Sequence, residues 1–182
     1  TAKLIGIEFP GGPFLEKFAE KGDQNRFILP EPIINRGGCN LSFAGLKTAV
    51  LKISKTIKNN QDKYDLAASF QKTIENILNK KTKVAFREFK DISFKKRNIF
   101  VIAGGVAANI KIRESLATLS LKENFEPIFP PMDLCGDNAA MIAVAGLERF
   151  KKRKFNSLNF SVKPRWSLDK KAAFLKGSGV RL

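Results

Sequence analysis

The longest regular pattern of apolar and polar positions in the chain lies between residues 62 and 90. Apolar side chains recur there at the three- and four-residue spacing that places them on one face of a helix: Ala67, Phe70, Ile74, Ile77, Leu78, Ala85 and Phe89. Lys80, Lys81 and Lys83 are most simply assigned to the opposite, polar side. The pattern therefore predicts one long helix whose lysines form a solvated face.

Shorter patterns of the same kind predict further helices. Residues 42–48 lead into a helix in which apolar residues recur at helical spacing at Leu46, Val50, Ile53 and Ile57. We expect Asn59-Asn60 to end that helix. Helices are also expected over residues 14–20, 108–119 and 138–150, and residues 1–9 are typical of the end of a helix.

Two apolar runs, at residues 98–103 and 125–129, are typical of strands. The first is continuous and suits a buried parallel strand. Because a helix is expected between the two runs, the order favours α/β architecture. Prolines and glycines predict a turn at residues 10–13, and short strands and loops over residues 22–39.

The charge balance bears on the kind of partner. The 182-residue chain has 33 Lys and Arg against 17 Asp and Glu, a formal net charge of +16. This excess favours a polyanionic partner such as nucleic acid, and a compositional bias of the source is the alternative. After residue 150 a basic run is followed by aromatic residues: Lys151-Lys152-Arg153-Lys154, then Phe155, Phe160, Trp166 and Phe174. For this tail, a solvated basic surface is the alternative to a nucleic-acid contact.

The chain contains no histidine, which excludes several kinds of chemistry within it. Neither a Ser-His-Asp or Cys-His arrangement nor an HExxH zinc site can form. Cys39 and Cys135 lack CxxC spacing, which favours a reducing, cytoplasmic setting. No apolar run approaches the roughly 20 residues that span a bilayer, so no membrane partner is expected. Because the chain begins with Thr1, we expect a fragment or a processed chain.

Gly104-Gly105 and Asn109 are the first candidates for a binding site. A strand that ends in glycines and leads into a helix exposes backbone N–H groups where the helix dipole favours an anion or a nucleotide. Tight helix packing explains such glycines equally well. The Asn109 amide suits recognition of a base or ribose, or it is a helix N-cap.

Asp137, Gly12 and Glu16 are further candidates. Asp137 opens the helix expected at residues 138–150 and is either its N-cap or a metal ligand that faces nucleotide phosphates. A carboxylate suits Mg²⁺, or Fe²⁺ in a site with two histidines. Gly12 brings backbone close to a ribose and Glu16 accepts its hydroxyls, or the two residues form a tight turn and a solvent-facing side chain.

Taken together, these segments resemble the C-terminal part of the TsaD family, also called Gcp, the tRNA N6-adenosine threonylcarbamoyltransferases. The matching segments, in the family's order, are TAKLIG, PGGPFLEKFAEKG, LSFAGLKTAV, VIAGGVAANIKIRESL, LCGDNAAMIAVAGLERF and KPRWSLD. The resemblance implies an actin/Hsp70-like ATPase (ASKHA) fold with a mixed sheet flanked by helices. Residues 1–150 would form its C-terminal lobe and residues 151–182 a basic tail, and the N-terminal lobe would lie outside this chain.

The resemblance also implies an activity. The threonylcarbamoyl group would pass from threonylcarbamoyl-AMP to N6 of the adenosine next to the anticodon of tRNA. The implied partners are tRNA, a TsaB-like paralogue and a TsaE-like ATPase in the cytoplasm. The full-length protein would be an acyltransferase, and this chain alone is expected to be inactive.

Site residues follow from the matched motifs. The resemblance implies that Gly12 and Asn109 contact the substrate, and we expect Glu16, Gly104 and Gly105 to do so as well. It assigns Asp137 to one divalent metal ion, commonly iron, whose other ligands are two histidines outside this chain. The motif around Asp137 reads Cys-Gly-Asp-Asn, where the family has Thr in place of Gly136, so a hydroxyl beside the metal ligand is lost. No catalytic residue is assigned.

Two other classes of function stay open at this point. One is another enzyme of the same superfold, such as an ATPase or a small-molecule kinase. The other is a non-catalytic lobe that binds RNA or protein. A sialoglycoprotein endopeptidase has no support, because the chain contains no peptidase constellation.

Overall fold

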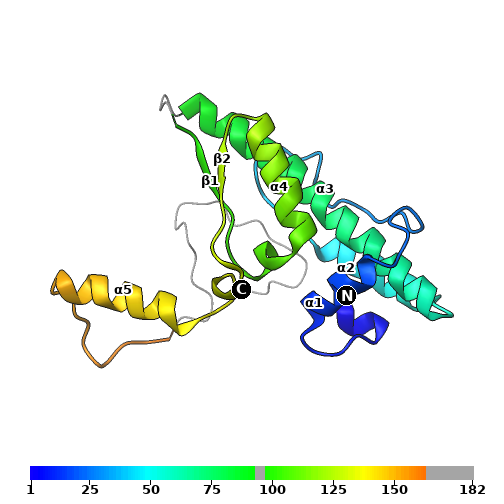
Figure 1. Ribbon diagram of the computed structural model, residues 1–182, viewed down its shortest axis with the longest axis horizontal. Helices are drawn as coiled ribbons and strands as arrows, with labels where there is room; N and C mark the ends of the chain where they lie inside the picture. Colours follow the sequence, from blue (N-terminus) through cyan, green and yellow to red (C-terminus); the bar gives the residue numbers. More distant parts are fainter. Residues whose placement is uncertain (93–96, 163–182) are drawn as a thin grey trace. The chain divides into compact units, whose positions relative to one another are not determined.

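The computed structural model describes residues 1–92 and 97–162, which form two units that are treated separately below (Figure 1). The first unit covers Thr1–Asp137 and the second begins at Asn138. The segment KPRWSLD, Trp166 and Phe174 lie outside the described residues, as does most of the basic tail. No helix among the described residues is long and apolar enough to cross a membrane.

The first unit is organised around one long helix, α3 (Asn60–Ile92), as its apolar stripe predicts. Its first half packs against α1 (Gly11–Ala19) and α2 (Ala44–Ser54), and the 3-10 helix η1 (Ala2–Ile5) packs against those two helices. The buried side chains of this first core are Ile5, Ala19, Leu29, Leu46, Val50, Leu66, Ala67, Ala68 and Ile77. Residues 1–9 therefore hold a short 3-10 helix rather than the end of an α-helix.

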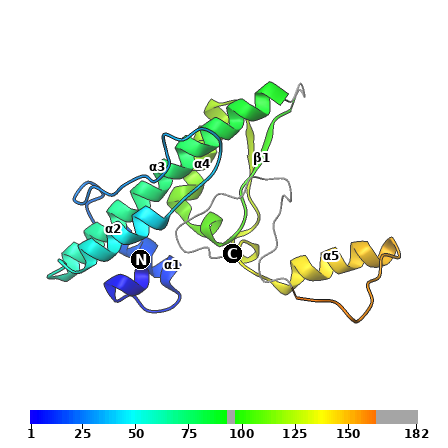
Figure 2. The same ribbon diagram turned by 180° about the vertical axis from the view of Figure 1, so that it is seen from behind.

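The second half of α3 lies beside a parallel β–α–β unit. Strand β1 (Ile99–Val101) leads through the 3-10 helix η2 (Gly105–Ala108) into α4 (Ile110–Lys122), which returns to β2 (Glu126–Ile128). The strands pair in parallel, with Phe100 opposite Pro127. Both views show α3 and α4 alongside each other (Figures 1 and 2). The α/β prediction is confirmed, and the described residues show only this two-stranded parallel sheet.

The expectation that residues 98–103 form a buried strand is wrong for most of its side chains. Ile99 and Val101 are 43% and 61% exposed. Only the alternate residue, Phe100, points to the helices, where its ring meets Phe86 of α3 edge-on at 4.9 Å. Phe86 also stacks on Phe125 at 3.9 Å. Because side chains alternate across a strand, α3 covers one face of this sheet.

The prediction of a turn at residues 10–13 is also wrong. The chain enters α1 directly at Gly11, with extended Pro10 as the N-cap. Pro13 fits in the first helical turn because the N–H groups there have no partner within the helix. Gly11 is required by close approach, since an added Cβ would lie 2.6 Å from the Ala2 Cβ.

Residues 22–39 form turns and bends with no strand, and Lys81 of α3 anchors them. The assignment of Lys81 to a solvated face is wrong, because it is only 4% exposed. Its ammonium donates to the carbonyls of Arg36 and Gly38, at 2.7 and 3.0 Å. Lys80 and Lys83 remain exposed but form ion pairs.

The boundary between α2 and α3 differs from the prediction. α2 ends at Ser54, so Ile57 lies beyond it. Asn59 does not end a helix but caps the next one, since its Oδ1 accepts from the Asp62 N–H at 2.9 Å. Asn is favoured at both positions, as a helix breaker and as an N-cap.

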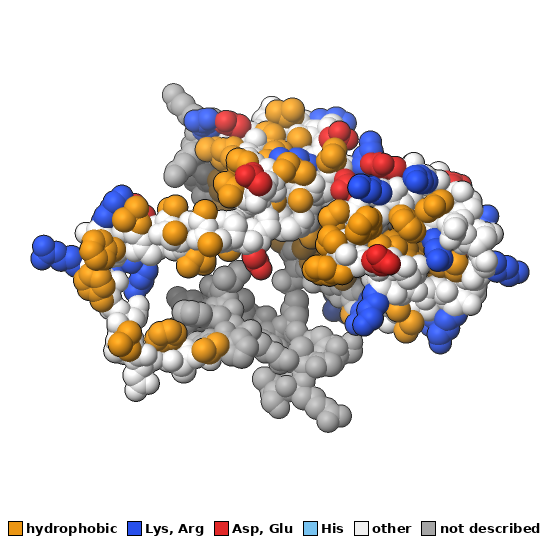
Figure 3. All heavy atoms as spheres, turned by 60° about the horizontal axis from the view of Figure 1, so that its bottom comes forward, with side chains coloured by type: hydrophobic (Ala, Val, Ile, Leu, Met, Phe, Trp, Pro, Cys, Tyr) orange, Lys and Arg blue, Asp and Glu red, His pale blue; other side chains and the backbone are white. Residues whose placement is uncertain are grey.

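The second unit contains α5 (Ala139–Lys151), close to the predicted residues 138–150. Large apolar side chains of α5 and the segment after it are exposed, and Figure 3 shows hydrophobic side chains gathered along this segment at the left. They are Met141, Ile142, Val144, Leu147, Phe150 and Phe155. The basic run at residues 151–154 is exposed too.

Candidate functional site

The loop between β1 and η2 presents two exposed glycines. Gly104 has φ +93°, a conformation that side chains with a Cβ rarely adopt. An added Cβ at Gly104 or Gly105 would meet no atom within 4 Å. Tight helix packing therefore does not explain these glycines, and the backbone of the loop is accessible.

Asn109 is the N-cap of α4. Its Oδ1 accepts from the Ile112 N–H at 2.9 Å. Its Nδ2 donates to Oε1 of Gln71 on α3 at 2.8 Å. The N-cap interpretation is confirmed, and substrate recognition by Asn109 stays a prediction. An amide has two protons and two acceptor lone pairs, so the capping role does not use up the side chain.

Glu16 reaches the same end of α4 from α1. Its Oε1 accepts from the Ile110 N–H at 2.6 Å, a contact between residues 94 positions apart. Glu16 is half-buried, so a purely solvent-facing role is wrong. A carboxylate at a helix N-terminus is favourable both as an acceptor and against the helix dipole. This contact joins α1 to the start of α4.

Gly12 lies in the first turn of α1, four residues before Glu16. Residues four apart share a helix face, so Gly12 and Glu16 lie on the same side of α1. Gly12 is exposed, has no positive φ, and an added Cβ there would meet nothing within 4 Å. The tight-turn explanation for Gly12 therefore fails, and its contact with a substrate stays a prediction.

Asp137 follows the 3-10 helix η3 (Met132–Leu134) and is not the cap of α5. Asn138 caps that helix instead, because its Oδ1 accepts from the Met141 N–H at 2.9 Å. The Asp137 side chain is exposed, and no contact of its carboxylate is seen among the described residues. Capping of α5 therefore does not account for Asp137.

The residues present fit a metal ion only in part. An exposed carboxylate suits Mg²⁺ or Fe²⁺. Within residues 1–92 and 97–162, no group of three or more His, Cys, Asp or Glu side chains could hold a metal ion. Asp137 could therefore be one ligand of a site whose other ligands come from elsewhere.

Arg113 is the residue that the sequence analysis missed. Its guanidinium donates to the Ala107 carbonyl at 2.9 Å, the Pro130 carbonyl at 3.0 Å and the Cys135 sulfur at 3.1 Å. A cation in the first turn of a helix opposes the helix dipole. An arginine near the N-terminus of a helix is therefore unfavourable unless other groups accept its hydrogen bonds. Its place in the sequence was the sign that such acceptors exist.

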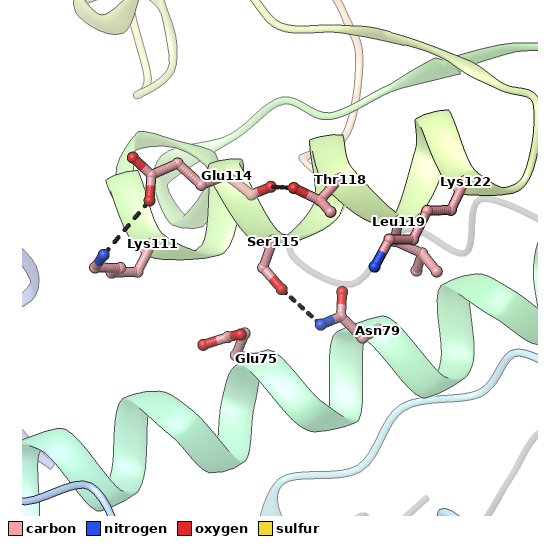
Figure 4. Close-up of a pocket in the computed structure, with 8 residues that line it drawn as sticks. All are labelled: Glu75, Asn79, Lys111, Glu114, Ser115, Thr118, Leu119 and Lys122. Carbon is pink, nitrogen blue, oxygen red and sulfur yellow. Dashed lines mark hydrogen bonds and ion pairs between the residues drawn. The ribbon is translucent and has the colours of Figure 1, made fainter.

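Two surface pockets lie away from these residues. One, about 450 Å³, lies between α3 and α4 and is shown in Figure 4. There the Asn79 amide of α3 donates to the Ser115 hydroxyl of α4 at 2.6 Å. The other, about 440 Å³, is lined mainly by basic residues of α3: Lys80, Lys83, Arg87 and Lys90. Neither pocket contains a residue that the sequence predicted for the site.

The only clear changes in side-chain acidity among the described residues lie outside this region. Burial and a hydrogen bond to Glu88 raise the pKa of the Cys39 thiol. On the sheet, a hydrogen bond from Arg97 lowers the pKa of Glu126. These shifts mark local contacts and give no support for a further reactive group.

The β1–α4–β2 unit, with its open glycine loop and its capped helix, defines an α/β protein with parallel strand pairing. The family model described as "TsaD: tRNA N6-adenosine threonylcarbamoyltransferase" matches residues 1–144. The chain therefore belongs to the TsaD family.

Proteins with the name tRNA N6-adenosine threonylcarbamoyltransferase are similar to most or all of the chain. The one from Pelagibacter ubique (strain HTCC1062) is 67% identical over 182 residues, which are 100% of this chain and 51% of the relative. The one from Rickettsia massiliae (strain Mtu5) is 50% identical over 173 residues, covering 93% of this chain and 50% of the relative. The chain spans about half the length of the curated relatives it matches.

Proposed function

We propose that the chain is the C-terminal part of an enzyme that forms N6-threonylcarbamoyladenosine in tRNA. Membership of the TsaD family carries this proposal, together with relatives of that name that align over the whole chain. The contact from Glu16 to Ile110 supports it, since it joins two of the predicted substrate segments. Because the relatives are about twice as long, the chain would supply only part of the active site.

The proposed fold is an actin/Hsp70-like ATPase fold in which residues 1–150 form the C-terminal lobe. The parallel β1–α4–β2 unit and the helices packed on it are compatible with such a lobe. The longer relatives would provide the rest of the sheet and the second lobe. This would account for the exposed side chains of β1, which have no cover among the described residues.

The substrate proposed for the glycine loop is threonylcarbamoyl-AMP. Gly12, Gly104 and Gly105 leave backbone open where a ligand can approach closely. Asn109 would contact the substrate with the amide capacity that capping leaves free. Glu16 would use its second carboxylate oxygen, because Oε1 already accepts from Ile110.

Asp137 is proposed as one ligand of a divalent metal ion, Fe²⁺, with two histidines from the N-terminal part of the full-length protein. Its exposed carboxylate and the presence of a different cap for α5 support this role. When bound, such an ion would supply positive charge that stabilises negative charge on a phosphate.

The proposed reaction is acyl transfer. N6 of the adenine attacks the carbamoyl carbon, the bond from that carbon to the phosphate oxygen of AMP breaks, and AMP leaves with the electron pair. The proton lost from N6 passes to water. The residues of this chain hold and orient the acyl-adenylate, which lowers the entropic part of the barrier.

The proposed partners are tRNA, a TsaB-like paralogue and a TsaE-like ATPase, in the cytoplasm. The net charge of +16 supports contact with tRNA phosphates. The exposed basic run at residues 151–154 would contribute to that contact.

Three outcomes separate this proposal from its alternatives. The full-length protein that contains this chain is incubated with the TsaB-like and TsaE-like partners, ATP, threonylcarbamoyl-AMP and tRNA, and digested nucleosides are analysed by mass spectrometry. The proposal expects threonylcarbamoyladenosine. Phosphorylation of a small molecule from ATP without tRNA would instead indicate a kinase. Binding of tRNA without any product would indicate a non-catalytic lobe.

A further inference from the structure

One side chain connects the two halves of the proposed site. Arg113 of α4 is half-buried, and its guanidinium donates in two directions. Nε donates to the Ala107 carbonyl at 2.9 Å, which lies between the glycine loop and Asn109. Nη2 donates to the Pro130 carbonyl at 3.0 Å and to the Cys135 sulfur at 3.1 Å, two residues before Asp137.

The environment of Arg113 favours a fixed orientation. The guanidinium lies over the Phe129 ring, 4.6 Å from its centre. Cys135 is only 3% exposed and packs in a second cluster of buried residues with Ile102, Ala107, Ile112 and Leu116. No ion pair of Arg113 with an acidic side chain occurs in the described part of the chain. Its donors are therefore directed at the backbone and the sulfur of neighbouring loops.

We propose that Arg113 is a positioning residue that holds the Cys135–Asp137 segment against the loop at residues 104–109. It would fix the separation between the carboxylate proposed for the metal ion and the backbone proposed for the nucleotide. This inference rests on the proposed function. The planar fork of arginine carries donors in fixed, divergent directions, whereas the lysine ammonium is a compact point charge on a flexible stem.

This role has a measurable consequence. If the two half-sites have a fixed separation, binding of Fe²⁺ changes the affinity for AMP, and AMP changes the affinity for Fe²⁺ by the same factor. A residue that only stabilises the fold would not alter this coupling selectively. The coupling factor therefore distinguishes positioning from stabilisation.

The test compares Arg113→Lys, Arg113→Met and Lys111→Met in the full-length protein. Lys111 is the matched control, since it lies in the same turn of α4 and, in the described part of the chain, forms an ion pair only with Glu114 at the surface. AMP affinity is measured by anaerobic calorimetry with and without Fe²⁺, alongside melting temperature, kcat and KM. Loss of partners that orient a metal ligand typically reduces metal affinity or activity by about 10- to 100-fold.

We expect Arg113→Lys to melt within a few degrees of the unmodified protein. The factor by which Fe²⁺ and AMP change each other's affinity should fall about tenfold in this variant. Its kcat should also fall, while its KM for tRNA stays the same. Arg113→Met should lose at least as much, and Lys111→Met should keep both coupling and kcat. Unchanged coupling in Arg113→Lys would overturn the proposal, as would a parallel loss of melting temperature, AMP binding and Fe²⁺ binding.

Cys135→Ala provides a second route if the arginine variants do not fold. It removes one acceptor and leaves the bonds of Arg113 to Ala107 and Pro130 in place. The proposal expects weaker coupling with AMP affinity in the absence of Fe²⁺ unchanged, and full coupling would contradict it. If the unmodified protein makes no threonylcarbamoyladenosine, the proposed function fails. If it does so but shows no coupling, only the role of Arg113 fails.

Discussion

At the scale of single residues, two side chains predicted to bind substrate also hold the start of α4. Glu16 accepts from the Ile110 N–H, and Asn109 accepts from the Ile112 N–H. The first N–H groups of a helix have no partner within it, so such acceptors are needed whether or not a ligand is present. Substitutions at these positions will therefore change stability as well as the substrate binding that the proposal assigns to them.

Glu16 offers the clearest separation of these two effects. Glu16→Ala removes the acceptor of the Ile110 N–H and should lower the free energy of unfolding by about 1 kcal/mol. Glu16→Gln keeps an acceptor oxygen and should cost less than half of that. Urea denaturation of the full-length protein measures the difference. Equal stability of the two variants would show that the hydrogen bond to Ile110 contributes nothing.

Asp137 and Asn138 are neighbours with different predicted roles. Asn138→Ala removes the cap of α5 and should cost about 1 kcal/mol of stability, with Fe²⁺ content unchanged. Asp137→Asn should leave stability nearly unchanged and remove most of the bound Fe²⁺. Metal analysis and thermal melting of both full-length variants give the comparison. Retained Fe²⁺ in Asp137→Asn would contradict the ligand assignment.

At the scale of elements, periodic segments could be predicted and loop-dependent features could not. The apolar stripe correctly predicted α3, and the alternation of strands with helices predicted α/β architecture, in which β1 and β2 pair in parallel. The start of α1 was missed because Gly11 and Gly12 are typical of turns, although here Gly11 packs against η1. The reach of Glu16 to Ile110 depends on tertiary packing, which local spacing does not encode.

Lys81 shows how charge can conceal a helical signal. It follows Ile77 by four residues and Leu78 by three, which places it on the apolar face of α3. Lys80 and Lys83 lie off that face, and the loop of Arg36 and Gly38 folds over Lys81 alone of the three. Helical spacing identifies a face, whereas the contacts of an irregular loop have no sequence period. Lys81 therefore belongs to the anchor of that loop rather than to the solvated surface.

If Lys81 anchors the loop, its replacement should cost more stability than replacement of the adjacent Lys80. Lys81→Met leaves two carbonyls without their donor and should cost about 1–3 kcal/mol of stability. Lys80→Met is the control, since the Lys80 side chain is 57% exposed and forms a surface ion pair, worth at most about 1 kcal/mol. Denaturation midpoints of the two full-length variants provide the measurement. A larger loss in Lys80→Met would contradict the anchor.

At the scale of the whole molecule, the role proposed for the chain is that of part of an active site. It lacks histidine, and its described part holds no complete metal-ligand cluster. It nevertheless brings together Glu16 and the start of α4, and it leaves three glycines open to a ligand. The proposal that the longer protein supplies the remaining ligands accounts for this combination, and it rests on family membership and the length of the relatives.

The central claim is that this family member modifies the adenosine next to the anticodon. The most direct measurement incubates the full-length protein, the TsaB-like and TsaE-like partners, ATP and threonylcarbamoyl-AMP with two transcripts of one tRNA, one with adenosine and one with guanosine at that position. The account predicts threonylcarbamoyladenosine, detected by mass spectrometry, in the first transcript only, and a large loss of product with Asp137→Asn. No product in either transcript, or equal product with Asp137→Asn, would contradict it.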